Sequence, residues 1–242
     1  MRRALIKSMD RETYGNVLLK GTYIPGGPML PPSLDYAFDE LDKMNPDKYD
    51  VEAAKKLLAD AGWKDTDGDG FVDKDGKNLE LNFTFYSGRA ELPLFAEAVQ
   101  SDAKKVGIKV NLKNVDYNIL FDIGKKGEYD LLISNILTEQ AGDPEFFMNV
   151  YFRTNKDGNT PENASGYSNP EYDALSEKLS GEFDPAKRRD IIIQMEKIMM
   201  NDAGTVVLGY PKTNLVSSKN IANANIYPCD YYWVTKDITP AK

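Results

Sequence analysis

The strongest constraint on the fold is a strand–helix–strand pattern between residues 79 and 113. Apolar and polar residues alternate over residues 79–86, which is the period of a β-strand with one buried face. An amphipathic stretch over about residues 91–105 follows and can end at Gly107, and a second alternating run starts at Ile108. Because such a crossover is right-handed and joins parallel strands, the pattern predicts an α/β fold.

Further segments extend this prediction on both sides. Residues 117–125 predict a short helix, residues 129–136 an apolar strand at the centre of the sheet, and residues 205–210 a returning strand. Residues 1–19 predict a helix that breaks near Asp10.

Two later helices have clear start signals. Asn169 precedes Pro170, and Asp184 precedes Pro185, which is the pattern of a capping residue followed by proline in the first turn. We therefore expect a mostly helical region between the sheet and the returning strand.

An Asp/Gly-rich turn follows a short helix within residues 50–76. Asp65, Asp67, Asp69 and Asp73 have the spacing of the oxygen ligands in an EF-hand calcium loop. The position that needs a bidentate Glu is Gly76, and a strand follows in place of the second helix. Two interpretations stay open, a weak structural calcium site and a solvated turn that uses Asp and Gly for their backbone freedom.

Composition excludes several kinds of function. The formal net charge of −8 argues against nucleic-acid binding, since no basic stripe is present to neutralise phosphates. The chain has no histidine and one cysteine, Cys229, so Cys/His zinc sites and histidine-dependent nucleophiles are excluded. Cys229 lies among aromatic residues and is expected to be a small buried apolar residue.

The turn after the apolar strand is the best candidate for a ligand site. It contains Thr138, Glu139 and Asp143, and ligands of open α/β sheets bind beyond the carboxyl ends of the strands. Asp143 and Pro144 also fit an ordinary helix start, so that alternative is retained. A hydrolase with paired carboxylates, for example Asp130 with Asp143 or Glu139, is a competing class, but these carboxylates have no specific spacing. A third class is a calcium-dependent structural or adhesion module built on the Asp/Gly-rich turn.

The chain resembles the solute-binding proteins of dipeptide, oligopeptide and nickel ABC importers. The likeness is carried, in chain order, by RRALIKSMDRE, by AKKLLADAGW with DTDGDGFVDKDGK, by the strand at residues 109–115, and by YDLLISN, GDPEFF, GYSNPEYDALSEKL, FDPAKRRDIIIQMEKIM and VVLGYPKTNLVSS. These segments cover nearly the whole chain.

The resemblance implies a type II periplasmic-binding-protein-like lobe, in which helices flank a mixed sheet, as a fragment of a two-lobed protein. Residues 1–204 are expected to form the C-terminal ligand-binding lobe. Residues 205–242 are expected to form a returning strand and a tail that crosses toward the missing N-terminal lobe. Family members carry their export signal on that N-terminal half, so the resemblance implies an extracytoplasmic location, in the periplasm or lipid-anchored on the outer face of the membrane.

The implied function is solute capture by lobe closure for an ABC permease in the membrane, without catalysis and without a required cofactor. The cargo is expected to be nickel as a small chelate or a short peptide, and the resemblance of the C-terminal run LGYPKTNLVSS followed by PCDYYWVTKDI slightly favours the nickel type. In peptide-binding members an acidic residue of the GDP loop pairs with the amino group of the ligand, and Asp143 matches that position. Tyr210 and Asn214 are second candidate contacts, with a strand-end tyrosine and a turn asparagine as the alternative. Four arginines could bind a ligand carboxylate: Arg89, Arg153, Arg188 and Arg189.

Overall fold

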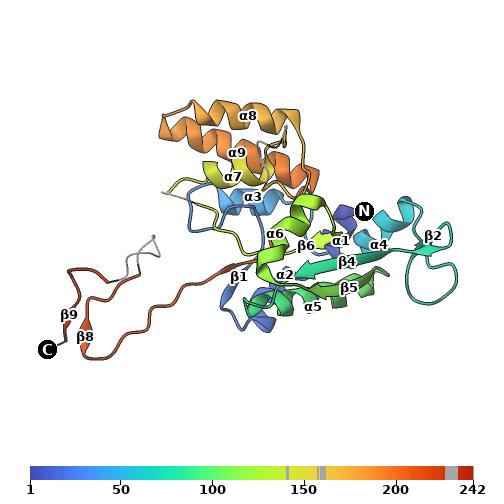
Figure 1. Cartoon of the computed structure of the whole chain (residues 1–242), viewed down its shortest axis with the longest axis horizontal. Helices are drawn as coiled ribbons and strands as arrows, with labels where there is room; N and C mark the ends of the chain where they lie inside the picture. The colour runs from blue at the N-terminus through green and yellow to red at the C-terminus, as the bar shows by residue number, and fades with distance from the viewer. Residues whose placement is uncertain (140–141, 157, 159–161, 227–233, 242) are drawn as a thin grey trace.

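A computed structural model describes residues 1–139, 142–156, 158, 162–226 and 234–241 of the chain. Figure 1 shows a sheet with its covering helices, a group of helices beside it, and an extended C-terminal segment that leaves both. Cys229 lies outside the described residues. Within the described residues, no helix has both the length and the apolar character needed to cross a membrane.

The central sheet contains three parallel strands in the order β5-β4-β6. These are β4 (Glu80–Phe85), β5 (Lys109–Asn114) and β6 (Leu131–Leu132), with α5 (Glu91–Lys105) crossing from β4 to β5 and α6 (Tyr117–Lys126) following β5. The predicted strand–helix–strand unit is therefore confirmed. Gly127 ends α6 with φ +66°, as its position after the helix predicts.

The prediction that residues 129–136 form the central strand is wrong, because β4 is central and β6 pairs with it over only two residues. The segment is apolar for another reason. Ile133 packs against the core beside the sheet, whereas Ile136 packs against the helical group. The segment of residues 129–136 therefore connects the core beside the sheet to the core of the helical group.

The N-terminal helix breaks where the sequence predicts. It consists of α1 (Arg2–Ser8), α2 (Arg11–Thr13) and the π-helix η1 (Tyr14–Leu18). The side chain of Asp10 accepts a hydrogen bond from the amide of Thr13 at 3.0 Å, so it starts a new helix and does not continue the old one.

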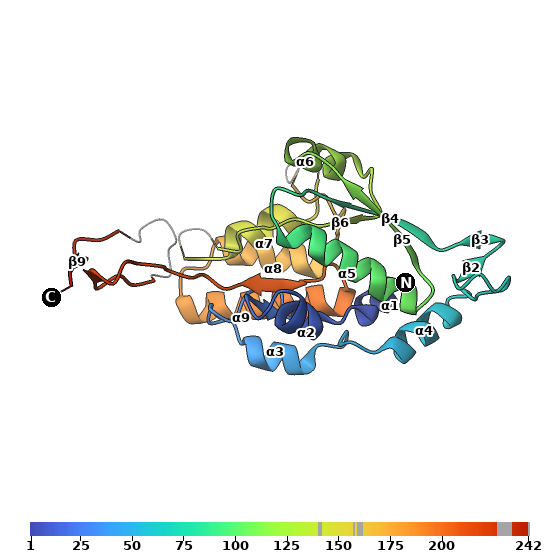
Figure 2. The ribbon, with the colours of Figure 1, turned by 90° about the horizontal axis from the view of Figure 1, so that it is seen from below.

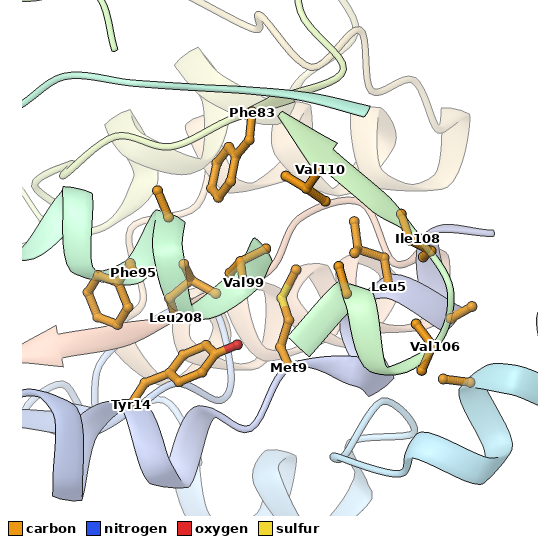
Figure 3. Close-up of a cluster of buried hydrophobic side chains, with 14 of the residues drawn as sticks. Leu5, Met9, Tyr14, Phe83, Phe95, Val99, Val106, Ile108, Val110 and Leu208 are labelled. Atoms are coloured by element: carbon orange, nitrogen blue, oxygen red, sulfur yellow. The ribbon is translucent and has the colours of Figure 1, made fainter. Parts of the chain in front are cut away.

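The main core lies between the sheet and the helices α1, α4 (Val51–Asp60) and α5 (Figure 3). Phe83 and Val110 from the strands meet Leu5 and Met9 from the N-terminal segment, and each is nearly inaccessible to solvent. Burial of each such side chain contributes roughly 1.5–3 kcal/mol. The N-terminal helices are thus an integral part of the sheet layer.

A short helix and a hairpin carry the Asp/Gly-rich turn. Helix α4 (Val51–Asp60) begins at Asp50, which accepts a hydrogen bond from the amide of Ala53. The turn leads into β2 (Asp73–Lys74), which pairs with β3 (Lys77–Asn78). Asp75 and Gly76 both have positive φ, so this is a two-residue hairpin turn.

A second core joins three helices with the loop near Met29 and Leu30. The helices are α7 (Glu145–Phe152), α8 (Pro170–Ser180) and α9 (Pro185–Asp202). Helix α3 (Phe38–Met44) follows that loop and buries Leu41. The starts of α8 and α9 are confirmed, since Asn169 and Asp184 cap them.

The returning strand is part of the packed body. β7 (Gly209–Pro211) pairs antiparallel with β1 (Tyr23–Pro25), and Leu208 lies in the main core. After a hydrogen bond from the amide of Lys212 to the carbonyl of Thr22, the chain extends away from the body. There β8 (Ile221–Ala222) pairs with β9 (Thr239–Pro240), far from the sheet in both views (Figures 1 and 2). The antiparallel pairs are separate ladders, so the central sheet is parallel where a mixed one was expected.

Candidate functional site

Three loops meet at the carboxyl edge of the central sheet. The loop after β4 contacts the end of β5, where the side-chain amide of Asn114 donates to the hydroxyl of Ser87 at 3.2 Å. The segment after β6 contacts the start of α5 through Asn135, whose side-chain amide donates to Glu91 at 3.3 Å. Ligands of parallel sheets bind at this edge, because the loops there converge.

Strand β1 adds Tyr23 to this edge. Burial raises the pKa of Tyr23 above its ordinary value, and a hydrogen bond to Glu91 raises it further, whereas the nearby Arg89 lowers it. We call Tyr23, Ser87, Arg89, Glu91, Asn114 and Asn135 the carboxyl-edge cluster. It combines one cation, one carboxylate and several neutral hydrogen-bonding groups.

Arg89 is exposed, and no ion pair engages it among the described residues. The other candidate arginines differ from it. Arg188 bonds Asp143 and Glu145, and Arg189 bonds Asp35 at 3.1 Å. Arg153 also takes part in an interaction. Arg89 is therefore the candidate arginine whose fork is best placed to receive a ligand carboxylate.

Asp143 has two structural partners in this conformation. Its Oδ2 accepts from Arg188 at 2.9 Å, and its Oδ1 accepts from the amide of Glu145 at 2.8 Å, at the start of α7. Burial alone would lower the pKa of Arg188, but hydrogen bonds to Glu145 and Asp143 raise it above the ordinary value. The guanidinium also donates to the carbonyls of Leu179 and Glu182, so it ties three helices together. The helix-start interpretation of Asp143 describes these contacts, and its ligand role stays a prediction.

The other predicted contacts lie in different surroundings. Thr138 and Glu139 are half-buried after β6, and Glu139 accepts a hydrogen bond from the amide of Gly142 at 3.0 Å. Tyr210 is buried, with its hydroxyl donating to the carbonyl of Pro28, so it fastens a loop. Asn214 is exposed on the departing segment. The loop thus joins Glu139 to the residue before Asp143, while Tyr210 is occupied within the fold.

The Asp/Gly-rich turn gathers three of its four predicted carboxylates. Oxygens of Asp65, Asp67 and Asp73 lie within 4.8 Å of one another, whereas Asp69 accepts from the side chain of Asn78 at 2.8 Å. Asp65 accepts from two glycine amides, and Asp73 accepts from the amide of Thr66 at 2.7 Å. These bonds are those of a solvated turn, and the hairpin at Gly76 supplies no bidentate ligand. The donor set therefore fits a calcium loop only in part.

Sequence reasoning missed most of the carboxyl-edge cluster. The sequence does contain one indication of it, the polar residues Ser87, Gly88 and Arg89 directly after an apolar strand. The rule that ligands bind beyond the carboxyl ends of strands, which selected the loop after β6, applies to these residues as well. Tyr23 and Asn135 carry no such signal, because tertiary contacts alone bring them to the edge.

Comparison with known proteins agrees with this architecture. Residues 1–159 match the family model of bacterial extracellular solute-binding proteins, family 5 middle. The chain is 27% identical to the oligopeptide-binding protein AppA of Bacillus subtilis over 98% of its length, and 26% identical to the nickel-binding protein NikA of Staphylococcus aureus over 97%. It spans 44% of each of these relatives.

The fold is similar to that of a solved structure. The structure of AppA from Bacillus subtilis in complex with a nonapeptide superposes with a TM-score of 0.82 at 24% identity, covering 100% of this chain and 47% of that one. The family match covers more than half of the chain and the fold follows the same pattern, so this chain belongs to the family 5 bacterial extracellular solute-binding proteins.

Proposed function

We propose that this chain forms one side of the ligand site of an ABC-importer solute-binding protein, and that the site lies at the carboxyl-edge cluster. The observation that carries the proposal is the exposed guanidinium of Arg89 at an edge where three loops converge. A carboxylate is the natural partner of such a group, and both a peptide and a metal chelate of an amino acid contain one. The relatives named above bind oligopeptides and nickel.

Capture, and not turnover, is the proposed mechanism. The ligand contacts this body on one side and another part of the same protein on the other, so it stabilises the closed state by its differential affinity. The remaining length of the relatives, beyond the 44% that this chain spans, is where that second side would lie. We place the protein outside the cytoplasm, where it delivers its ligand to membrane permease subunits.

The C-terminal arm, residues 213–226 and 234–241, is proposed to pack against that second part. Val216 is 92% exposed and Val234 is 89% exposed, and the arm forms its strand pair apart from the body. Apolar residues on an extended segment favour burial against a partner surface. The arm would thus join the two sides behind the ligand.

The test uses the full-length protein that contains this chain, in thermal-shift and calorimetric titrations with a dipeptide panel and with nickel plus histidine. Arg89→Ala should weaken binding of the preferred carboxylate ligand by roughly ten- to a hundred-fold, since a hydrogen bond to a charged group contributes about 1.5–3 kcal/mol. Arg189→Ala is the matched control, because its surface pair with Asp35 does not involve the cluster. Equal affinity of Arg89→Ala and the wild type would refute this site.

A further inference from the structure

Three aromatic rings lie in contact beside the carboxyl-edge cluster. Tyr86 follows β4, Tyr117 is the first residue of α6, and Phe121 lies one turn later. The ring centroids of Tyr86 and Tyr117 are 5.0 Å apart at an interplanar angle of 61°, and those of Tyr117 and Phe121 are 5.5 Å apart at 86°. Both are edge-on contacts, so each neighbour restrains the plane of Tyr117.

Tyr117 presents its ring to solvent. It is 50% exposed, while Tyr86 beneath it is only 5% exposed, and no hydrogen bond of the Tyr117 hydroxyl is found among the described residues. Ile119 on the same helix is 48% exposed. The ring therefore has a supported side and an open side, and its hydroxyl has an electrostatic interaction with Tyr151 of α7.

This ring belongs to the same edge as Arg89. The bond from Asn114 to Ser87 joins the end of β5, three residues before Tyr117, to the loop that carries Arg89. A Cβ placed on Gly88 would stand 3.5 Å from the ring of Tyr86, so the backbone next to Arg89 packs on the aromatic group. A ligand whose carboxylate reaches Arg89 consequently has the open side of Tyr117 within its surroundings.

We infer that Tyr117, supported by Tyr86 and Phe121, is a subsite for a planar ring that stands close to the ligand carboxylate. The inference rests on the proposed function and names the ligand class more closely. Two sources supply this chemistry, a peptide that ends in an aromatic residue and a chelate that contains the imidazole of histidine. Stacking on a fixed ring requires no rearrangement of the protein. The preference for ring-bearing ligands should therefore appear as a higher binding affinity.

The experiment compares, in the full-length protein, dipeptides that share the first residue and end in Phe, Tyr, Leu or Gly, with nickel plus histidine as a separate arm. We expect ring-bearing ligands to bind roughly tenfold or more tighter than the Gly-ended peptide. Tyr117→Ala should reduce that ratio to below about threefold, whereas Tyr117→Phe should preserve it. Phe183→Ala is the control, since this ring is 86% exposed and lies between α8 and α9.

The outcomes separate the two proposals. Equal affinity for the Phe- and Gly-ended peptides would overturn the ring subsite and leave the carboxylate site in place. A ratio unchanged by Tyr117→Ala, together with a lower melting temperature of the unliganded protein, would overturn it too, because the ring would then pack against another part of the protein. Binding of neither peptide nor chelate would overturn both proposals.

Discussion

Arg188, in the first turns of α9, places its Nη2 atom 2.9 Å from Oδ2 of Asp143, at the end of the loop that follows β6. This pair fixes the end of a candidate ligand loop to the helical core. It also means that the carboxylate predicted to meet a ligand amino group already has a cation beside it.

The first prediction concerns this pair. Arg188→Ala should lower the free energy of unfolding by roughly 1.5–3 kcal/mol, because the bonds to Asp143, Glu145 and two carbonyls are lost. Arg188→Lys should recover only part of the loss, since an ammonium cannot reproduce the fork. Urea denaturation followed by circular dichroism measures both, and a change below about 0.5 kcal/mol for Arg188→Ala would contradict the anchoring role.

The second prediction concerns Glu196, which is 1% exposed on α9 and accepts a hydrogen bond from the amide of Leu30 at 2.7 Å. Its Oε2 has no partner among the described residues. Burial raises the pKa of Glu196 to about 8, against an ordinary value of 4.5. The folded state therefore binds a proton that the unfolded state releases near pH 4.5. The stabilisation is fully present below that pH and is lost as the pH rises through about 8.

Melting curves of the wild type and of Glu196→Gln between pH 5 and 9 test this sign. Glutamine has the shape of the protonated acid but does not ionise, so the stability of the wild type relative to the variant should fall with increasing pH. The slope should reach at most about 1.4 kcal/mol per pH unit. Parallel pH profiles of the two proteins would show that Glu196 does not titrate in this way.

The third prediction concerns Tyr210. Tyr210→Phe removes a hydroxyl that donates to Pro28 and accepts from the amide of Gly27, and should cost roughly 1–2 kcal/mol of stability. Since the side chain is buried, ligand affinity should not change. Calorimetry of Tyr210→Phe beside Asn214→Ala checks this, and a loss of affinity with unchanged stability would restore Tyr210 as a ligand contact.

The fourth prediction concerns the Asp/Gly-rich turn. Asp73→Ala removes the acceptor for the amide and hydroxyl of Thr66 and should destabilise the fold by about 1–3 kcal/mol. If the turn is held by its own hydrogen bonds, millimolar calcium should leave the melting temperature unchanged. A rise on adding calcium that disappears in Asp65→Asn and Asp67→Asn would instead establish a metal site.

The sequence predicts the elements well where the signal is local. The limits of α5 and the caps of α8 and α9 follow from helical periodicity and from capping residues that act within one turn. The place of β6 does not follow, because an apolar run that serves two cores is indistinguishable from a central strand. Helix α3 was missed, since it buries Leu41 as its one core residue and gives no apolar stripe.

The sequence predicted the position of the candidate loop on the sheet, but not the contacts of its individual residues. A loop rich in carboxylates after an apolar strand pointed to the same edge of the sheet as the carboxyl-edge cluster, because strand polarity can be inferred from the crossover. The partners of each carboxylate could not be inferred. Arg188 meets Asp143 across 45 positions, and Asn135 meets Glu91 across 44, contacts that no local pattern encodes.

The short spacing between Ile133 and Ile136 limits how far the two cores can move apart. One side chain is set in the sheet core and the other in the helical core, and three residues of chain can span at most about 10 Å. Because this connection is so short, the sheet core and the helical core cannot move far apart at this point. A large displacement of the C-terminal arm should therefore occur where the chain leaves the body after Lys212, while the two cores move together as one unit.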